Sequence, residues 1–274
     1  NWQQIGEIID GTANYQHNGS SVSLSSDGSV IAIGASGTYS PFIQSHNGHN
    51  WGMVRIFKND SDTWEQVGIH ILGESDNTYS GNSVSLSSDG SVVAIGAHGY
   101  DGNGTESGHV RIYQNVSGTW TKIGDDIDGE AAGDYSGNSV SLSSDGSVVA
   151  IGAYSNDGNG DNSGHVRIYQ NVSGTWTQIG DDIDGETADD YSGYSVSLSS
   201  DGSVVAIGAT CNDGNGTSSG HVRIYQNVSG TWTQIGDDID GEAAGDYSGT
   251  SVSLSDNGTI VAIGAAYNEA NGPS

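Results

Sequence analysis

The chain of 274 residues is poor in several residue types, and each shortage excludes a class of protein. Cys211 is the only cysteine, so no internal disulfide can form and a disulfide-stapled scaffold is excluded. Proline, phenylalanine and methionine are nearly absent, with two, two and one copies. No stretch approaches the roughly 20 consecutive apolar residues of a membrane-spanning helix, so we expect no membrane insertion.

Basic residues are scarce as well. Six Lys and Arg stand against 34 Asp and Glu, which leaves a formal net charge of −28 at pH 7. Binding to DNA or RNA requires clustered positive side chains that neutralise phosphates, so nucleic acid is excluded as a partner. We interpret the acids mainly as solvated surface groups, although bound cations or a basic partner would also fit this charge.

Glycine is abundant in the chain, with 44 residues, and it occurs within a sequence segment that repeats. Trp2 opens this segment, and residues 137–192 are identical to residues 193–248 at 49 of 56 positions. A period of this length is typical of stacked supersecondary units that share a core. Four further tryptophans mark the 56-residue spacing: Trp64, Trp120, Trp176 and Trp232.

Each repeat contains four segments with the pattern of β-strands. In the third repeat, Asp145-Gly146 separates the first two and is a strong hairpin signal. Residues 147–153 are apolar or small on both faces, which indicates a strand buried on two sides. Four-stranded antiparallel units at a fixed period are typical of propeller blades. The four segments, called A, B, C and D here, are residues 139–143, 147–153, 165–170 and 175–179.

We therefore expect an all-β fold, a single β-propeller of about five four-stranded blades over residues 1–274. Residues 2–9 supply an N-terminal D strand that closes the last blade, and residues 250–265 supply that blade's A and B strands. Its C strand has no counterpart, so either further chain supplies it, or the fifth blade has three strands, or a neighbouring molecule supplies it by β-augmentation. The expected blades are 12–71, 72–127, 128–183, 184–239, and 240–274 joined with 1–11.

One known repeat family shares these phrases. Residues 136–140, Ile151-Gly152-Ala153 and residues 164–169 resemble the FG-GAP repeat. That repeat builds the propeller of integrin α subunits and of many secreted microbial proteins, so the resemblance implies a propeller. Ser136 stands where the motif has Phe. The short Asp145-Gly146 turn replaces the integrin calcium loop, so those metal sites are not carried over.

The differences between repeats fall on one face of the expected propeller. All seven differences between the third and fourth repeats lie in or beside the D–A and B–C connections, which share that face. Such variation is typical of a recognition surface, although looser steric constraint on loops would also produce it. The first repeat has a longer B–C loop, residues 36–52. The residues that we expect in recognition are Phe42, His46, His49, Trp51, Tyr154 and Tyr194.

Two places carry possible metal ligands. Asp157, Asn159 and Asp161 alternate with other residues in a B–C loop and resemble a calcium loop, because calcium prefers oxygen ligands. A solvated acidic loop is the alternative. His46 and His49 are spaced to reach one metal ion, although only two ligands are evident. Calcium is thus the only cofactor that the sequence suggests.

Two residue types recur once per blade at strand C. We expect the histidines at its start to be structural or half-exposed, and the arginines to pair with acids such as Asp126 or Asp182. The histidines are His109, His165 and His221, and the arginines are Arg55, Arg111, Arg167 and Arg223.

The chain contains eight Asn-x-Ser/Thr sequons. Three of them recur in the expected C–D turn, where the geometry permits a glycan, and glycosylation would require a secretory route. The sequon residues are Asn18, Asn59, Asn103, Asn115, Asn171, Asn215, Asn227 and Asn257.

No nucleophile–base pair, carboxylate pair or phosphate loop stands apart from the repeat, so we expect no enzyme. The sequence favours an extracellular structural or adhesive module, such as a glycosylated subunit of a surface or secreted fibre. It would contact a protein partner, or a second copy, through the incomplete blade. The alternative is a carbohydrate-binding propeller, calcium-dependent or not, in which tyrosine or tryptophan rings stack on sugars.

Overall fold

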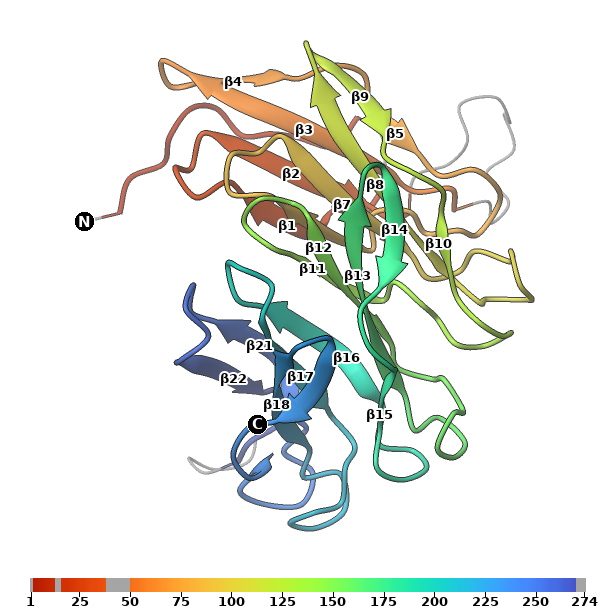
Figure 1. Ribbon diagram of the computed structural model, residues 1–274. Helices are drawn as coiled ribbons and strands as arrows, with labels where there is room; N and C mark the ends of the chain where they lie inside the picture. The colour runs from red at the N-terminus through yellow and green to blue at the C-terminus, as the bar shows by residue number, and fades with distance from the viewer. Residues whose placement is uncertain (1, 13–15, 38–49, 270–274) are drawn as a thin grey trace.

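The computed structural model describes residues 2–12, 16–37 and 50–269, and this part of the chain folds into strands and turns without a helix (Figure 1). No helix among these residues could therefore cross a membrane. The sheets follow one another in chain order. The first contains β1 (Asn18–Leu24), β2 (Val30–Ala35), β3 (Met53–Asp60), β4 (Thr63–Gln66) and β5 (Ile71–Leu72).

The next sheets repeat this arrangement. The second contains β6 (Ser83–Leu86), β7 (Val92–Ala97), β8 (His109–Val116), β9 (Thr119–Lys122) and β10 (Ile127–Asp128). The third contains β11 (Ser139–Leu142), β12 (Val148–Ala153), β13 (His165–Val172), β14 (Thr175–Gln178) and β15 (Ile183–Asp184). The fourth contains β16 (Ser192–Leu198), β17 (Val204–Ala209), β18 (His221–Val228), β19 (Thr231–Gln234) and β20 (Ile239–Asp240). The fifth contains β21 (Ser248–Leu254) and β22 (Val261–Ala265).

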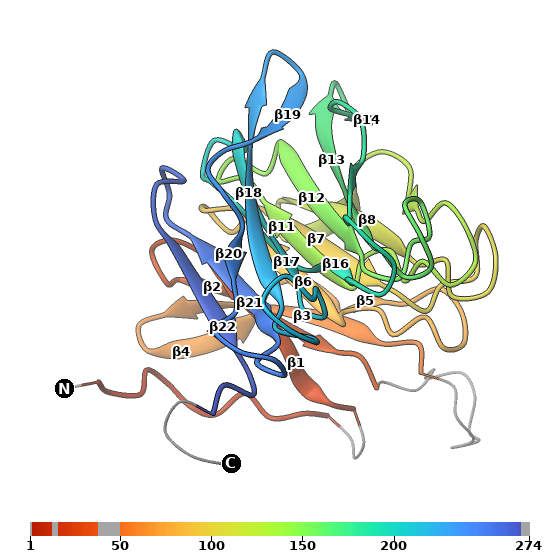
Figure 2. The same ribbon diagram turned by 90° about the horizontal axis from the view of Figure 1, so that it is seen from below.

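Each of the four large sheets is an antiparallel A–B–C–D unit, as the repeat predicts. The turn between A and B forms because the Asp145 carboxylate accepts hydrogen bonds from the Ser143 hydroxyl and the Ser147 amide, at 2.7 and 2.9 Å. The sequence reading missed the two-residue fifth strand of each sheet, β5, β10, β15 and β20. Figure 2 shows the outer strands β14 and β19 projecting away from the inner strands β11 and β16.

The core lies between successive sheets. Val54 and Ile56 of the first sheet pack with Val93 and Ile95 of the second, and each of these side chains is at most 1% exposed. Equivalent clusters join the second sheet to the third and the third to the fourth. Because both faces of a B strand contact a neighbouring sheet, its side chains alternate between two cores. The continuous apolar run of residues 147–153 follows from this position.

The inner strands approach one another closely at a glycine. A Cβ atom at Gly152 of β12 would overlap the backbone oxygen of Gly193 in the next sheet. The same relation holds between Gly96 and Gly137 and between Gly208 and Gly249. The sequence Ile-Gly-Ala therefore recurs because only glycine permits the crowded packing of the inner strands.

The tryptophans of the repeat connect one sheet to the preceding one. Trp176 Nε1 donates a hydrogen bond to the Ile123 carbonyl oxygen, and Trp64 Nε1 donates one to the Ile5 oxygen. The N-terminal segment therefore lies against the first sheet. The D segments of the first three sheets lie in the same way against the sheets that come after them. Residues 2–12 form no strand in the described chain, so the closing of the last blade by this segment stays a prediction.

The first and last sheets each leave an apolar face uncovered. Val22 and Leu24 of β1 are 62% and 54% exposed, whereas the equivalent Val84 and Leu86 of β6 are each 8% exposed. At the other end Ile260 is 69% exposed, and its equivalent Val204 is 6% exposed. The outer edge of β22 has no strand partner among the residues that the structure describes. At each interior junction, the faces equivalent to these two pack against each other.

Candidate recognition site on the loop face

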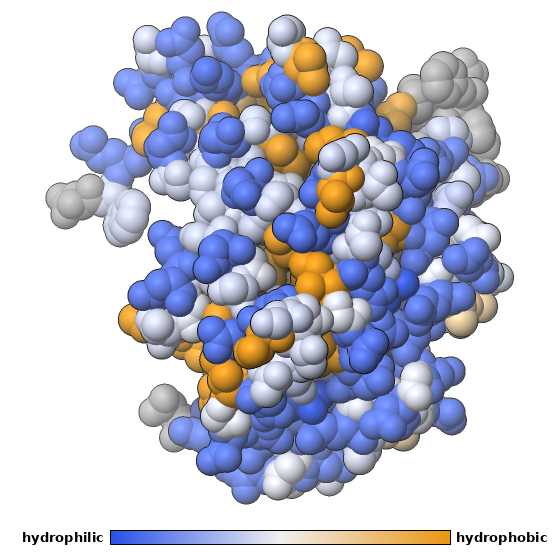
Figure 3. Space-filling model, in the orientation of Figure 1, coloured by the Kyte–Doolittle hydropathy of each residue, from blue (hydrophilic) through white to orange (hydrophobic). Residues whose placement is uncertain are grey.

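The D–A and B–C loops lie together on one face of the propeller, as the repeat predicts. Hydrophilic residues cover most of the right and lower edge of Figure 3, where the loops of Figure 1 lie. Buried acids hold the loops in place. The Asp134 carboxylate, 3% exposed, accepts hydrogen bonds from the backbone amides of Glu130 and Ala131. Asp246 accepts the equivalent bond from the Ala243 amide.

A row of aromatic rings crosses this face from one sheet to the next. Tyr79 stacks on His98 with ring centroids 5.3 Å apart, and His98 lies 5.9 Å from Tyr135. Tyr135 stacks on Tyr154 at 5.5 Å. Tyr154 then contacts two rings of the following sheet, Tyr191 and Tyr194, each at 5.8 Å. The D–A and B–C connections of three successive sheets therefore contribute to one aromatic surface.

Four tyrosines of the D–A connections occupy an unusual backbone conformation. Tyr79, Tyr135, Tyr191 and Tyr247 have φ between 52° and 56°, in the left-handed region. A bulky residue in this region is strained and persists only where its surroundings enforce it. The loops enforce it here, because the amides of Tyr135 and Tyr191 donate to the backbone oxygens of Glu106 and Asn162. Each tyrosine ring is thereby fixed on the loop face.

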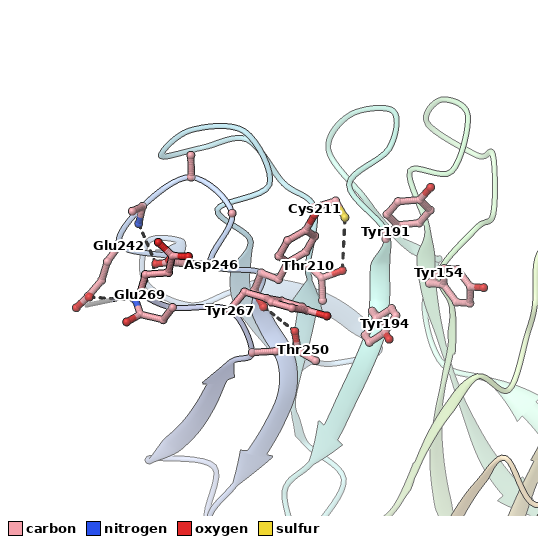
Figure 4. Close-up of a pocket in the computed structure, with 16 residues that line it drawn as sticks. Tyr154, Tyr191, Tyr194, Thr210, Cys211, Glu242, Asp246, Thr250, Tyr267 and Glu269 are labelled. Atoms are coloured by element: carbon pink, nitrogen blue, oxygen red, sulfur yellow. Dashed lines mark hydrogen bonds between the residues drawn. The ribbon is translucent and has the colours of Figure 1, made fainter. Parts of the chain in front are cut away.

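A large cavity opens where this face reaches the fourth and fifth sheets (Figure 4). Its volume is about 1170 Å³. Tyr154 and Tyr194 lie on one side, and Tyr267 lies across the cavity from them. Tyr267 also contacts Tyr247, with ring centroids 5.3 Å apart. Tyr194 and Tyr267 are 40% and 64% exposed, so their rings are accessible to a ligand.

The residues that differ between repeats converge on this cavity. Of the seven variable pairs of the third and fourth repeats, five place at least one member in the cavity wall. Thr210 replaces the tyrosine that the third repeat has at this position, and the smaller side chain leaves space beside Tyr267. The variable residues of the wall are Tyr154, Tyr194, Thr210, Cys211, Ala243 and Gly245.

Hydrogen bonding and burial shift the pKa values of several titratable groups on the loop face. The Tyr135 hydroxyl donates a 2.6 Å hydrogen bond to Glu106, and this bond raises the pKa of Tyr135 to about 12. Burial raises the pKa of Tyr154 and of the Cys211 thiol. Cys211 is half-buried with a protonated thiol, so it is a wall residue and not an activated nucleophile. The cavity presents neutral aromatic rings and hydroxyls beside carboxylates such as Glu242.

Of the recognition residues predicted in the first blade, only Trp51 lies among the described residues, and it does not line this cavity. Phe42, His46 and His49 lie outside the described residues, and so does the metal pair predicted for the two histidines. Trp51 is described, and its indole Nε1 donates a 2.6 Å hydrogen bond to Asp76. Tyr154 and Tyr194, in contrast, are brought together as the variable loops predict. The sequence reading missed Tyr191, Tyr247 and Tyr267, although the recurring Tyr-Ser-Gly phrase marks the first two.

The loop predicted to bind calcium uses its polar side chains to hold its own shape. The Asp157 carboxylate accepts a 2.7 Å hydrogen bond from the Asn162 amide. Asn159 Nδ2 donates to the Gly185 and Glu186 oxygens, so its amide nitrogen faces the backbone. Asp161 accepts a bond through its backbone oxygen. Calcium binding at this loop remains a prediction.

The arginines of the C strands have different partners from those expected. Arg111 Nη1 lies 2.7 Å from Glu74, while Asp126 pairs with Lys122 instead. Arg167 lies nearest Glu130, at 3.5 Å, and also donates to the Asp128 carbonyl oxygen. The prediction that these arginines pair with acids is therefore confirmed, but the acids are Glu74, Glu130 and Glu186 rather than Asp126 or Asp182. The preceding sheet supplies the carboxylate, because the arginine bridges two sheets.

Five of the eight sequons fall into two structural groups. Asn115, Asn171 and Asn227 lie in exposed C–D turns, where the side-chain oxygen accepts the amide of the glycine three residues on. This leaves the nitrogen, the atom that carries a glycan, directed away from that bond. Asn103 and Asn215 instead donate through Nδ2 to backbone oxygens of the neighbouring segment. The turns are therefore the better acceptor sites.

Comparison with known proteins supports the repeat family and the fold. The FG-GAP repeat family model matches residues 127–169, from β10 into β13. A search of curated proteins found no match. Among solved structures, a provisionally named 6-phosphogluconolactonase from Bacteroides uniformis is similar, with 13% identity and a TM-score of 0.56. The similarity covers 89% of this chain and 77% of the other.

A second structure, a provisionally named TolB from Agrobacterium tumefaciens, has 16% identity and a TM-score of 0.43. The similarity covers 79% of this chain and 61% of that one, less than two thirds of its length. At 13% identity, the first of these two structures is evidence of a similar fold alone. The repeated four-stranded sheets and the matched repeat define the class: an all-β, propeller-type protein that carries the FG-GAP repeat.

Proposed function

We propose that this protein is a non-enzymatic adhesive propeller that binds carbohydrate in the tyrosine-lined cavity of its loop face. The observation that carries the proposal is the convergence of variable residues and tyrosine rings on one accessible cavity of about 1170 Å³. Its volume suits an oligosaccharide rather than a single ion. The neighbouring propellers of known structure speak to fold only, so the proposal rests on the cavity itself.

The chemistry of the cavity wall supports a sugar ligand. The C–H face of a pyranose ring packs on an aromatic ring, while its hydroxyls require hydrogen-bond acceptors and donors at the edge. Tyr194 and Tyr267 offer exposed rings on opposite sides of the cavity. Glu242 is exposed at the rim and carries acceptor oxygens. The acidic surroundings favour neutral or basic sugars over sulfated or sialylated ones.

A glycan array probed with the soluble protein tests this proposal. Wild-type protein should bind a chemically related set of glycans. Replacing Tyr194 with alanine should weaken binding about tenfold, the loss expected when one aromatic contact is removed. Tyr194→Phe should retain most of the affinity, and Trp51→Ala, at a residue that does not line the cavity, serves as the matched aromatic control. Equal binding by wild type and Tyr194→Ala would rule out this cavity as the site.

A second candidate function, assembly, is favoured by the uncovered faces of the first and last sheets. Val22 and Leu24 at one end and Ile260 at the other are exposed, while their interior equivalents are buried. Interior junctions show what covers such faces, namely the complementary face of the next sheet. We propose that the two ends associate head to tail between copies, so that the protein polymerises into a fibre.

Analytical ultracentrifugation over a range of concentrations tests this assembly. Wild-type protein should form concentration-dependent oligomers, and the double variant V22S/L24S should sediment as a monomer. I69S, which alters an apolar residue that is 81% exposed away from β1, is the control and should behave as wild type. A monomer at every concentration, with β1 protected from hydrogen exchange, would instead mean that the chain covers its own ends.

We propose an extracellular location for this module. Support comes from the sequons in the exposed C–D turns, whose acceptor nitrogens are free of the neighbouring backbone. The single half-buried cysteine is compatible with an oxidising compartment. Glycopeptide mass spectrometry of the native protein should detect modification at Asn115, Asn171 or Asn227, and a complete absence of glycan there would contradict a secretory route.

A further inference from the structure

Three buried histidines face pairs of carboxylates at successive junctions between sheets. His109, His165 and His221 begin the C strands β8, β13 and β18, and each is at most 1% exposed. Each imidazole meets an Asp from its own sheet and a Glu from the preceding sheet. The clusters are Glu74–His109–Asp126, Glu130–His165–Asp182 and Glu186–His221–Asp238. They lie apart from the tyrosine-lined cavity.

The distances within these clusters are too long for hydrogen bonds. His165 Nδ1 lies 3.6 Å from Asp182 Oδ2 and 4.0 Å from Glu130 Oε2. His221 Nδ1 lies 3.7 Å from Asp238 Oδ2 and 3.9 Å from Glu186 Oε2. A hydrogen bond would need about 2.7–3.2 Å. Two atoms that each lie about 2.1 Å from one tetrahedral ion are roughly 3.4 Å apart, so the Asp oxygens nearly match this spacing and the Glu oxygens would move about half an ångström closer on binding.

The histidines have unmet bonding capacity. Neither ring nitrogen of His109 or His221 has a hydrogen-bond partner, and Nε2 of His165 has none. A buried imidazole without a partner is costly, because it loses its hydrogen bonds to water. An ion between Nδ1 and the two carboxylates would satisfy that nitrogen and the facing oxygens together.

Outer contacts hold the carboxylates in the required orientation. Gln178 Nε2 donates a 2.6 Å hydrogen bond to Asp182 Oδ1, and Gln234 Nε2 donates an equal bond to Asp238 Oδ1. In each case the second oxygen, Oδ2, remains directed at the histidine. Hydrogen bonds that orient a ligand from behind are characteristic of built metal sites. Arg167 similarly lies nearer to Glu130 Oε1 and leaves Oε2 for the histidine.

We propose that these clusters are divalent-cation sites of the zinc type, which join neighbouring blades. One imidazole nitrogen and two carboxylate oxygens are ligands that suit Zn²⁺, and the nitrogen ligand disfavours Ca²⁺ and Mg²⁺. Water would complete the coordination, because the Glu and Asp side chains reach solvent, with Glu130 and Asp182 47% and 29% exposed. The ion would link a Glu of one sheet to the His and Asp of the next.

The chain itself provides unequal versions of the site. The first blade has Met53 at the histidine position and His70 at the Asp position, so it lacks the site. In the Glu74 cluster, Lys122 replaces the glutamine and lies 2.6 Å from Asp126. This added positive charge opposes cation binding. The proposal therefore predicts two tight sites and one weaker site per chain.

Calorimetric titration of metal-free full-length protein with Zn²⁺ tests the proposal, and Co²⁺ absorption reports the ligand geometry. Wild type should bind two Zn²⁺ tightly and raise its melting temperature. E130Q and E186Q, both at exposed positions, should each abolish one tight site, and H165Q should do the same as E130Q. K122Q should convert the weak site into a third tight one.

Ca²⁺ titration and the variant D157N provide the controls. Zinc stoichiometry should be unchanged in D157N, and a tenfold excess of Ca²⁺ should not displace Zn²⁺. Absence of saturable Zn²⁺ binding by wild type would overturn the proposal. So would tight binding that survives in folded E130Q and E186Q, because the glutamates would then not be ligands.

Discussion

At the scale of single residues, the carboxylates of the A–B turns stabilise the repeat. Asp201 Oδ1 accepts hydrogen bonds from the Ser203 hydroxyl, the Ser203 amide and the Ser199 hydroxyl, at 2.7–2.9 Å. The Ser203 contacts, chiefly, lower the pKa of Asp201. In the first blade, the Ser29 amide and the hydroxyls of Ser25 and Ser29 lower the pKa of Asp27 to about 2.

This geometry predicts an acid-sensitive fold. A carboxylate whose pKa is lower in the folded state contributes stability above its unfolded pKa, which is near 4, and loses it as the pH falls through the folded value. Stability should therefore decline as pH falls from about 4 to about 2. Asp201→Ala should cost roughly 1 kcal/mol at pH 7 and flatten that decline, as measured by urea unfolding. Asp181→Ala, in the exposed segment after β14, should change neither, and an equal effect of both variants would contradict the turn explanation.

The burial of single residues was the hardest property to predict from sequence. His109, His165 and His221 begin strands whose following residues are apolar, but nothing in the local pattern shows that these histidines are buried where two sheets meet. Burial lowers the pKa of His109 to about 3 and that of His165 to about 4, so both imidazoles are neutral. The recurrence of the three histidines, once per blade with an Asp 17 residues later, was the available signal.

At the scale of elements, the inner strands depend on glycine. Gly152→Ala should destabilise the protein by about 2 kcal/mol or more, because the new Cβ overlaps the Gly193 backbone and neither strand can move without disturbing both cores. Gly264→Ala is the matched control. It occupies the same place in β22, and its Cβ would meet only Ser251. Its cost in urea unfolding should be under about 1 kcal/mol, and equal losses would refute the crowding explanation.

Strand identities were predictable where side chains alternate, and not elsewhere. The segments 139–143, 147–153, 165–170 and 175–179 match β11 to β14 to within about two residues at each end. β15 was missed because Ile183–Asp184 lies in an acidic segment without alternation, and only its pairing with β13 makes it a strand. The N-terminal segment repeats the Trp-x-x-x-Gly phrase of the D strands but has no strand partner among the described residues, so its role in the last blade stays a prediction.

At the scale of the whole molecule, the repeat predicts the architecture and leaves the ends undetermined. Repetition alone shows that each sheet packs on the next, and the inter-sheet clusters confirm this. The cavity could not be predicted as a site, because Tyr154, Tyr194 and Tyr267 come from three different sheets. Its location was nevertheless indicated by the positions at which near-identical repeats differ. The exposed Val22 and Ile260 faces became visible only in three dimensions.

We propose the tyrosine-lined cavity as the carbohydrate-binding site of this protein. The most direct test is a crystal structure of the protein with the strongest ligand from the glycan array. The account predicts a sugar ring packed against Tyr194 or Tyr267, with its hydroxyls near Glu242. A sugar bound elsewhere on the propeller, with this cavity filled only by water, would contradict it.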